Sequence, residues 1–207
     1  MGVDMMKIII KYILTWAIMF ALIFLSFDVL KAVHQKNTRM NMYQLNDYIY
    51  SEELTDRTVW IAANIEEILE DLPEEIKENI INKYEIMLIY DEDSYAAKVN
   101  PLQAIIYVNL NCKAHNYEPA LRAIIYHEVG HTVQYKTMAF DEELYFKYKS
   151  YNGLEGPFFD TDYTHSSIKE FYATVFSIYM TDPVYLYENY EDLYEYISEK
   201  TESFPRF

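Results

Sequence analysis

The sequence of 207 residues has a single cysteine, Cys112, so no disulfide can form within the chain. Glycine is scarce, at four residues, and basic side chains number 17 against 33 acidic ones, a formal net charge of -16. Such a chain is repelled by nucleic acid phosphates and by anionic lipid head groups, so we expect no nucleic acid partner. A basic or neutral polypeptide is the more natural partner for this acidic chain.

Charged side chains are also missing from one long run near the N-terminus. Residues 12–27 contain none, and residues 8–27 contain only Lys11. A membrane-spanning helix needs about 20 apolar residues and a signal-peptide core about 7–15, so this segment lies between the two. We therefore expect residues 8–27 to contact a membrane. The alternative is an apolar helix buried in a soluble domain.

The end of this run favours a retained anchor over a removed signal. Leu30-Lys31-Ala32 is a poor signal-peptidase site, because such sites have small residues at the cleavage positions. We expect residues 1–36 to be an N-terminal anchor or signal segment. Residues 37–207 then form one domain that is either tethered outside the cell or secreted. This domain is long enough to bury a substantial core.

The strongest motif is His127-Glu128-Val129-Gly130-His131, which has the spacing HExxH. On a helix, His127 and His131 lie one above the other and can bind one zinc ion from one side. Glu128 can then reach a water molecule at the open coordination position and act as a general base, as in metallopeptidases. The alternative is an amphipathic core helix with two buried histidines. Gly130 is unfavourable within a helix unless another element packs closely against it.

A catalytic zinc site of this kind needs a third protein ligand. Thr137 stands where a third histidine would follow at the spacing of another HExxH class, so that class is excluded. Glu170 is the best candidate, because it lies in an apolar helical segment whose next positions on the same face are small. Those small residues are Ala173, Thr174 and Ser177. Ser167 to Glu170 also fits a helix capping box, in which Glu170 would only cap the helix.

Other glutamates and histidines fit less well. Glu142 and Glu143 follow the motif too closely to fold back over the ion, and Glu155 lies in a loop rich in glycine and proline. His115 is expected on a surface loop. His165 either assists near the metal or faces solvent.

These residues in combination resemble a known family. The HExxH motif, the run from Lys169 to Phe176 and Tyr163 together resemble the catalytic domains of anthrax lethal factor and of the secreted Pro-Pro endopeptidases. The resemblance implies a zinc endopeptidase with ligands His127, His131 and Glu170. It also implies Glu128 as base and Tyr163 as the donor to the oxyanion.

Two interpretations compete with the resemblance. With 22 tyrosines in the chain, Tyr163 could simply be a packing residue. The whole protein could also be a catalytically inactive, membrane-tethered protein that binds zinc or a partner. The segments that select the substrate in the resembling enzymes are not recognisable in this sequence, so a preference for Pro-Pro bonds is not expected.

The implied fold is α+β, a zincin-like metallopeptidase that is mostly helical with a small sheet. The segment from Gln103 to Leu110 is the strongest predicted strand, and it either pairs with an extended substrate at an exposed edge or is an ordinary core strand. The segment from Asp91 to Pro101 is expected to be a polar connection. The remaining apolar patterns predict a strand at residues 85–90 and helices near residues 55–69, 73–81, 117–133, 141–150, 166–180 and 183–200. Tyrosines of the last helix are expected to serve packing.

Overall fold

The structure is a computed structural model that describes residues 13, 15–19, 29, 32, 36, 39–137, 141–151, 153–154 and 158–202. The chain divides into two compact units, residues 1–41 and residues 42–207. In the first unit, residues 13 and 15–19 are helical, and the other residues of the predicted anchor at 8–27 lie outside the described residues. No helix among the residues described is both long and apolar enough to cross a bilayer.

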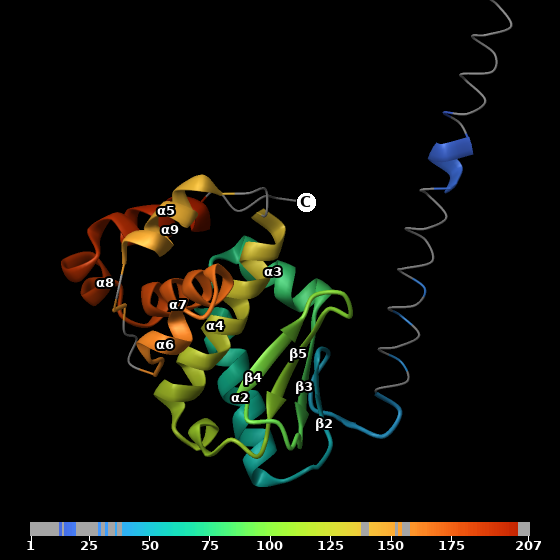
Figure 1. The fold of residues 1–207 in the computed structure, drawn as a ribbon. Helices are drawn as coiled ribbons and strands as arrows, with labels where there is room; N and C mark the ends of the chain where they lie inside the picture. The colour runs from blue at the N-terminus through green and yellow to red at the C-terminus, as the bar shows by residue number, and fades with distance from the viewer. Residues whose placement is uncertain are drawn as a thin grey trace, which may run out of the picture. The chain divides into compact units, whose positions relative to one another are not determined.

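The second unit is built on a mixed sheet of five strands (Figure 1). Its strand order is β1-β2-β3-β5-β4. The central pairs β2–β3 and β3–β5 are parallel, and the outer strands β1 and β4 are antiparallel to their neighbours. The strands are β1 (Tyr43–Gln44), β2 (Ile49–Ser51), β3 (Glu85–Ile89), β4 (Ala97–Asn100) and β5 (Ile105–Asn109).

The middle strands read as continuous apolar runs because both of their faces are covered. Ile86, Met87 and Leu88 of β3 are fully buried, as are Ile105 and Ile106 of β5. Parallel strands buried on both faces show this pattern, whereas strands with one wet face alternate. The middle of the sheet is therefore buried, whereas Lys98 of β4 and Tyr107 of β5 remain partly exposed.

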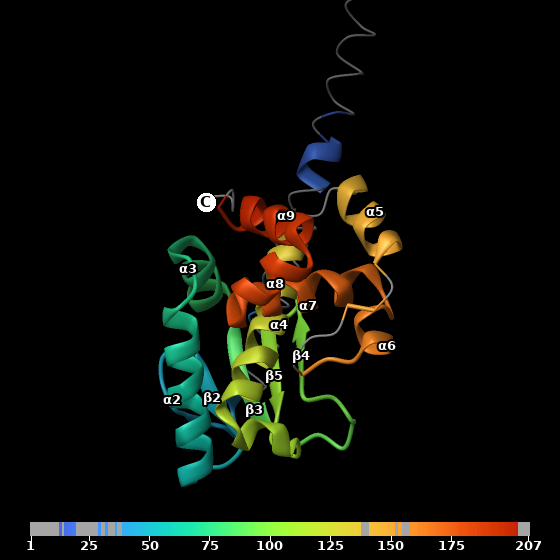
Figure 2. The ribbon, with the colours of Figure 1, turned by 90° about the vertical axis from the view of Figure 1, so that its left-hand side faces the viewer.

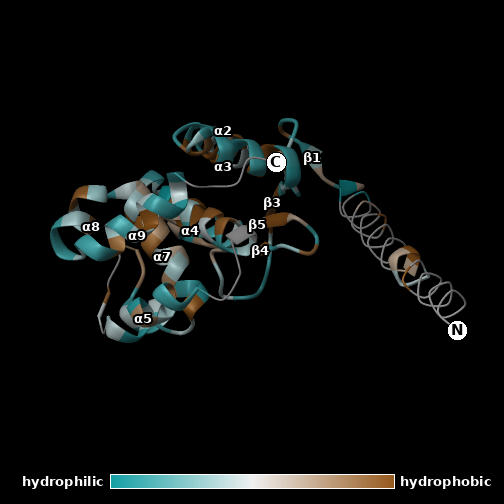
Figure 3. Ribbon diagram, turned by 90° about the horizontal axis from the view of Figure 1, so that it is seen from above, coloured by the Kyte–Doolittle hydropathy of each residue, from teal (hydrophilic) through white to brown (hydrophobic). Residues whose placement is uncertain are grey.

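Some of the helices pack against the sheet, and the others form a second group farther from it (Figures 1 and 2). The helix α4 runs between the sheet and the C-terminal helices (Figure 3). Buried apolar residues of α4 and α7 belong to the same hydrophobic core as those of β3 and β5. The described helices are α2 (Asp56–Glu70), α3 (Glu74–Lys83), α4 (Glu118–Thr137), α5 (Glu142–Ser150), α6 (Thr161–Thr164), α7 (Ile168–Thr181), α8 (Pro183–Asn189) and α9 (Glu191–Glu202), with the 3-10 turn η1 (Lys113–Asn116).

Local sequence sets several of these boundaries. Thr55 caps α2 in a capping box, since its hydroxyl accepts the Thr58 N–H while the Thr58 hydroxyl accepts the Thr55 N–H. Ser167 caps α7 by accepting the Glu170 N–H at 3.2 Å. Pro183 occupies the first turn of α8, where its missing N–H costs no helical hydrogen bond.

Most predicted elements are present, but two predictions about them were wrong. The predicted connection between Asp91 and Pro101 contains the edge strand β4. Of the two interpretations of the segment from Gln103 to Leu110, the core strand is confirmed, because this segment contains β5, which is paired on both sides and has no free edge. The single predicted C-terminal helix is two helices, α8 and α9, because the backbone leaves the helical conformation at Tyr190. The tyrosines of these helices do pack against the core or one another, as predicted.

The closest approach between two helices brings α4 against α7. A Cβ atom added at Gly130 would lie 2.9 Å from the Cα atom of Ala173 and 3.1 Å from the Cβ atom of Phe176. The hydroxyl of Ser177 donates to the carbonyl of Ala123 across the same contact, at 2.8 Å. The sequence-based expectation that a small-residue face of one helix packs at Gly130 is confirmed.

This contact predicts the effect of replacing Gly130 by alanine. The change gains about 1 kcal/mol of helix propensity. It also forces backbone atoms of α7 away, and such overpacking costs about 1–3 kcal/mol. We expect Gly130→Ala to lower the free energy of unfolding by roughly 1 kcal/mol, within a range of about 0–2 kcal/mol, measured by urea denaturation. A greater stability than wild type would mean that α4 and α7 lie farther apart.

Candidate active site

Three side chains on two helices meet at one point. His127 and His131 project from α4, and Glu170 projects from the first turn of α7. The Oε2 atom of Glu170 lies 2.9 Å from Nε2 of His127 and 3.4 Å from Nε2 of His131. Within the described part of the chain, these residues form the group of metal-binding side chains whose ligand atoms all lie within 4.8 Å of one another.

The two distances from Glu170 to the histidines agree with those around a tetrahedral metal ion. Bonds of about 2.0–2.1 Å place tetrahedral ligand atoms roughly 3.3 Å apart, close to the two distances measured at Glu170. The other ring nitrogen of His127, Nδ1, lies 3.5 Å from the hydroxyl of the buried Thr174. Metal-bound histidines commonly have such a partner, which fixes the ring and its tautomer.

The structure shows where the backbone N–H and the side chain of Glu170 each lie. Its backbone N–H is capped by Ser167, as a capping box requires. Its side chain, however, does not fold back to the cap but points at His127 and His131. Burial acts to raise the pKa of this carboxyl, but the contacts with both imidazoles outweigh that effect and leave the pKa well below its ordinary value. Glu170 is therefore an anionic ligand candidate.

Burial also shifts the pKa values of His127 and Glu128. It lowers the pKa of His127, which favours the neutral imidazole that a metal ion binds. Glu128 is 4% exposed, and burial raises its pKa to about 7. The Val99 N–H of β4 donates a hydrogen bond to the Glu128 carboxylate. Glu128 thus lies between the metal-ligand group and the free edge of the sheet.

Tyr163 reaches the same group from α6. Asp160 caps this single helical turn by accepting the Tyr163 N–H, at 2.7 Å. The Tyr163 hydroxyl lies 3.3 Å from Nε2 of His127. Burial and the nearby Glu170 carboxylate raise the pKa of Tyr163, so its hydroxyl keeps the proton that it can donate. The structure therefore brings together all five residues singled out in the sequence.

Sequence reasoning missed one aromatic residue of this site. The ring of Phe159 stacks on His127, with centroids 4.7 Å apart, and on Tyr163, with centroids 6.0 Å apart. Phe159 belongs to no periodic pattern in the sequence, so only its short distance from Tyr163 along the chain could have indicated it. The stacking limits the orientations open to both partners.

A cleft of about 370 Å³ opens beside these residues. One wall comes from Ser94, Tyr95 and Ala96 and the start of β4, and His127, Glu128 and Tyr163 also line the cleft. The other lining residues are largely apolar: Ala97, Ala114, Ala120, Ile124, Phe158, Phe159 and Asp160. A cleft of this size and character suits the side chain of a bound ligand next to the metal-ligand group.

The remaining candidates lie elsewhere. His115 is fully buried, so its predicted place on a surface loop was wrong; its Nε2 atom contacts the Ala96 carbonyl at 2.8 Å. His165 is partly buried, and its ring nitrogens face the carbonyl oxygens of Thr161 and Tyr151. Those contacts commit His165 to the local loop structure. Glu155 lies outside the described residues.

Comparison with solved structures shows a related fold. No protein-family model matches this sequence, and no curated protein matches it. The Pro-Pro endopeptidase PPEP-2 from Paenibacillus alvei is similar in structure, with a TM-score of 0.55 and 14% sequence identity. The match covers 75% of this chain and 98% of that one. The mixed α+β domain thus has the fold seen in that endopeptidase.

Proposed function

We propose that the protein is a zinc-dependent endopeptidase that hydrolyses peptide bonds of a protein substrate. The observation that carries this proposal is the meeting of His127, His131 and Glu170 beside the buried carboxylate of Glu128. Two imidazoles and one carboxylate are a donor set of catalytic zinc sites. The fold likeness to an endopeptidase supports the same assignment.

The position of β4 supports a polypeptide substrate. This strand is the edge of the sheet, and its Val99 N–H reaches Glu128. An extended peptide can pair with such a free edge, and the pairing would place one of its bonds next to the catalytic group. The neighbouring cleft would take an apolar side chain of that peptide, since alanines, Ile124 and phenylalanines line much of it.

In the proposed reaction, Glu128 transfers a proton and Tyr163 binds the oxygen of the scissile carbonyl. A bound zinc ion supplies Lewis acidity toward the scissile carbonyl and lowers the pKa of water. Glu128 takes the proton of the attacking water and passes it to the leaving amine nitrogen. The Tyr163 hydroxyl donates a hydrogen bond to the carbonyl oxygen as it becomes negative.

We also propose that residues 8–27 hold the protein at a membrane, with residues 37–207 outside the cell as the catalytic domain; release as a secreted protein is the alternative. The uncharged run at residues 12–27 motivates this proposal. We expect the full chain to sediment with membranes and to be digested by protease added to intact cells. Recovery of the uncut protein in the soluble cytosolic fraction would contradict the proposal.

Two substitutions distinguish zinc binding from catalytic activity. Wild type and Glu128→Gln should each hold one zinc per chain, because Glu128 is not a ligand. Glu170→Gln should hold less zinc, since it loses the anionic ligand. Only wild type should cut peptides, and a chelator should stop it; loss of a general base typically costs about 10²–10⁴ in rate. Zinc content by atomic absorption and cleavage of a peptide library measure both. Full zinc without any cleavage by wild type would instead favour a zinc-binding protein without activity.

Tyr163→Phe tests the donor to the oxyanion. The substitution removes the hydroxyl and keeps the ring that stacks on Phe159. We expect kcat to fall by about 10²–10³, as when one such donor is lost, with unchanged zinc content and melting temperature. Tyr187→Phe, at a half-exposed tyrosine of α8, is the matched control. If kcat stays at the wild-type value, Tyr163 has only a packing role.

A further inference from the structure

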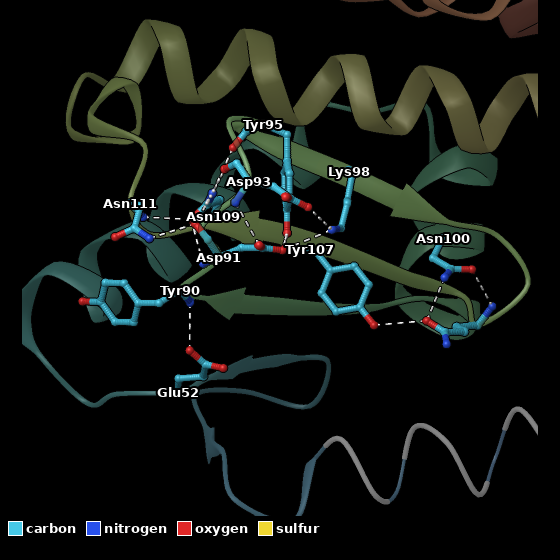
Figure 4. Close-up of polar contacts among 11 residues, drawn as sticks. Glu52, Tyr90, Asp91, Asp93, Tyr95, Lys98, Asn100, Tyr107, Asn109 and Asn111 are labelled. Atoms are coloured by element: carbon cyan, nitrogen blue, oxygen red, sulfur yellow. Dashed lines mark hydrogen bonds and ion pairs between the residues drawn. The ribbon is translucent and has the colours of Figure 1, made fainter.

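The wall of the cleft that precedes β4 is wrapped around one buried side chain. Asn109, the last residue of β5, is 1% exposed. Its Nδ2 atom donates to the carbonyl oxygens of Asp91, Asp93 and Tyr95, at 3.0–3.1 Å. Figure 4 shows the chain from Asp91 to Tyr95 curling around this side chain. We name residues 91–96 the wall loop.

The other polar atoms of Asn109 extend the same anchor. Its Oδ1 atom accepts the N–H of Asp91 at 3.2 Å and that of Asn111 at 3.0 Å. Its backbone N–H donates to the Ala96 carbonyl at 2.9 Å. The buried His115 contacts the same Ala96 oxygen at 2.8 Å. The wall loop is therefore held from its first residue to its last by groups that do not line the cleft.

A second set of contacts holds the wall loop from the solvent side. The ammonium group of Lys98 lies 3.2 Å from Oδ2 of Asp91 and 3.9 Å from the centre of the Tyr95 ring. The Tyr95 hydroxyl donates to the same Asp91 carboxylate. Lys98 is a partly exposed residue of β4, so its contribution is expected to be smaller than that of the buried Asn109.

The loop contributes directly to the cleft. Ser94, Tyr95 and Ala96 line it together with His127 and Glu128, and Ala97 begins the edge strand. A shift of the loop would change the shape of the cleft without touching the metal-ligand group. The hydrogen bonds of Asn109 therefore hold this wall of the cleft without contacting His127, Glu128 or Glu170.

We propose that Asn109 is a positioning residue for substrate selection: through the wall loop it sets the shape of the cleft that takes an apolar substrate side chain beside the scissile bond. This proposal rests on the proposed peptidase function. It assigns to Asn109 an effect on substrate binding, expressed in KM, and none on the chemical step. His115 acts on the same wall at Ala96.

The test replaces Asn109 by aspartate, which keeps the size and one acceptor oxygen but puts a second acceptor oxygen where the two N–H groups of the amide face the three carbonyl oxygens. Two ten-residue peptides serve as probes, one excised from casein around a bond that wild type cuts next to leucine or phenylalanine, the other carrying alanine at that position. For the first peptide we expect KM to rise about tenfold or more with unchanged kcat, the pattern of lost substrate binding. For the alanine peptide we expect little change.

Asn111→Asp is the matched control. Asn111 is exposed and donates to the same Asp91 carbonyl, at 2.8 Å, so the identical substitution removes one outer contact of the loop and leaves Asn109 in place. Its KM should stay near the wild-type value. Hydrogen exchange at residues 91–96 should quicken in Asn109→Asp and remain near wild type in Asn111→Asp.

Lys98→Met keeps the proposal falsifiable if Asn109→Asp does not fold, because it changes only a partly exposed side chain. It should raise KM for the apolar peptide by a few-fold at unchanged kcat and zinc content. Two results would overturn the role of Asn109 while leaving the proposed peptidase function intact, provided that wild type cuts casein. One is an unchanged KM in the variants, and the other is a kcat that falls equally for both peptides. A wild-type protein that holds zinc and cuts neither casein nor a peptide library would overturn the proposed function, and this inference with it.

Discussion

The structure depends on how closely α7 can approach α4. Glu170 sits on one helix and the two histidines on the other, so the distance between the helix axes decides whether the three ligand atoms can share an ion. That distance is set by residues with little or no side chain at the contact, Gly130 on α4 and Ala173 on α7. Backbone meets backbone there, and no rearrangement of rotamers can replace that fit.

The close packing of α7 against α4 also explains how the carboxylate of Glu170 can be partly buried in a chain that is acidic overall. Removing an ionised carboxylate from water is costly unless it gains partners. Glu170 gains contacts with two imidazoles, whereas burial outweighs the effects of His131 and of the Val99 N–H on Glu128 and makes Glu128 a weaker acid. Two glutamates of one site are thereby given opposite tendencies by packing alone.

Much of this arrangement could be predicted from the sequence, because helical periodicity is local. The spacing of His127 and His131 fixes their common face, and the small residues after Glu170 indicate which face of the second helix packs closely. The sheet was harder to predict. Strand β4 has a polar, partly exposed sequence, and nothing local reveals that β5 lies inside the sheet while β4 forms its edge. That difference is a matter of strand order, which depends on contacts between distant segments.

Residues without periodicity escaped prediction for a related reason. Phe159 and Asn109 act through contacts that are set by loop paths, and the buried position of His115 depends on where the wall loop ends. Polar residues in such places look like surface residues in a sequence, because polarity normally marks exposure. Such residues can be distinguished from surface residues only by asking which buried backbone N–H and C=O groups need a hydrogen-bond partner.

The amide of Asn109 gathers three backbone carbonyl oxygens in the way that a bound calcium ion gathers oxygen ligands in other loops. The nearby Asp91 and Asp93 even have a spacing typical of such loops. In this loop, the NH2 group of Asn109, which is the positive end of the amide dipole and belongs to strand β5, takes the place of an ion. A dissociable ion would make the shape of a loop depend on the concentration of that ion. An amide cannot dissociate, so these hydrogen bonds are present wherever the strand β5 is folded.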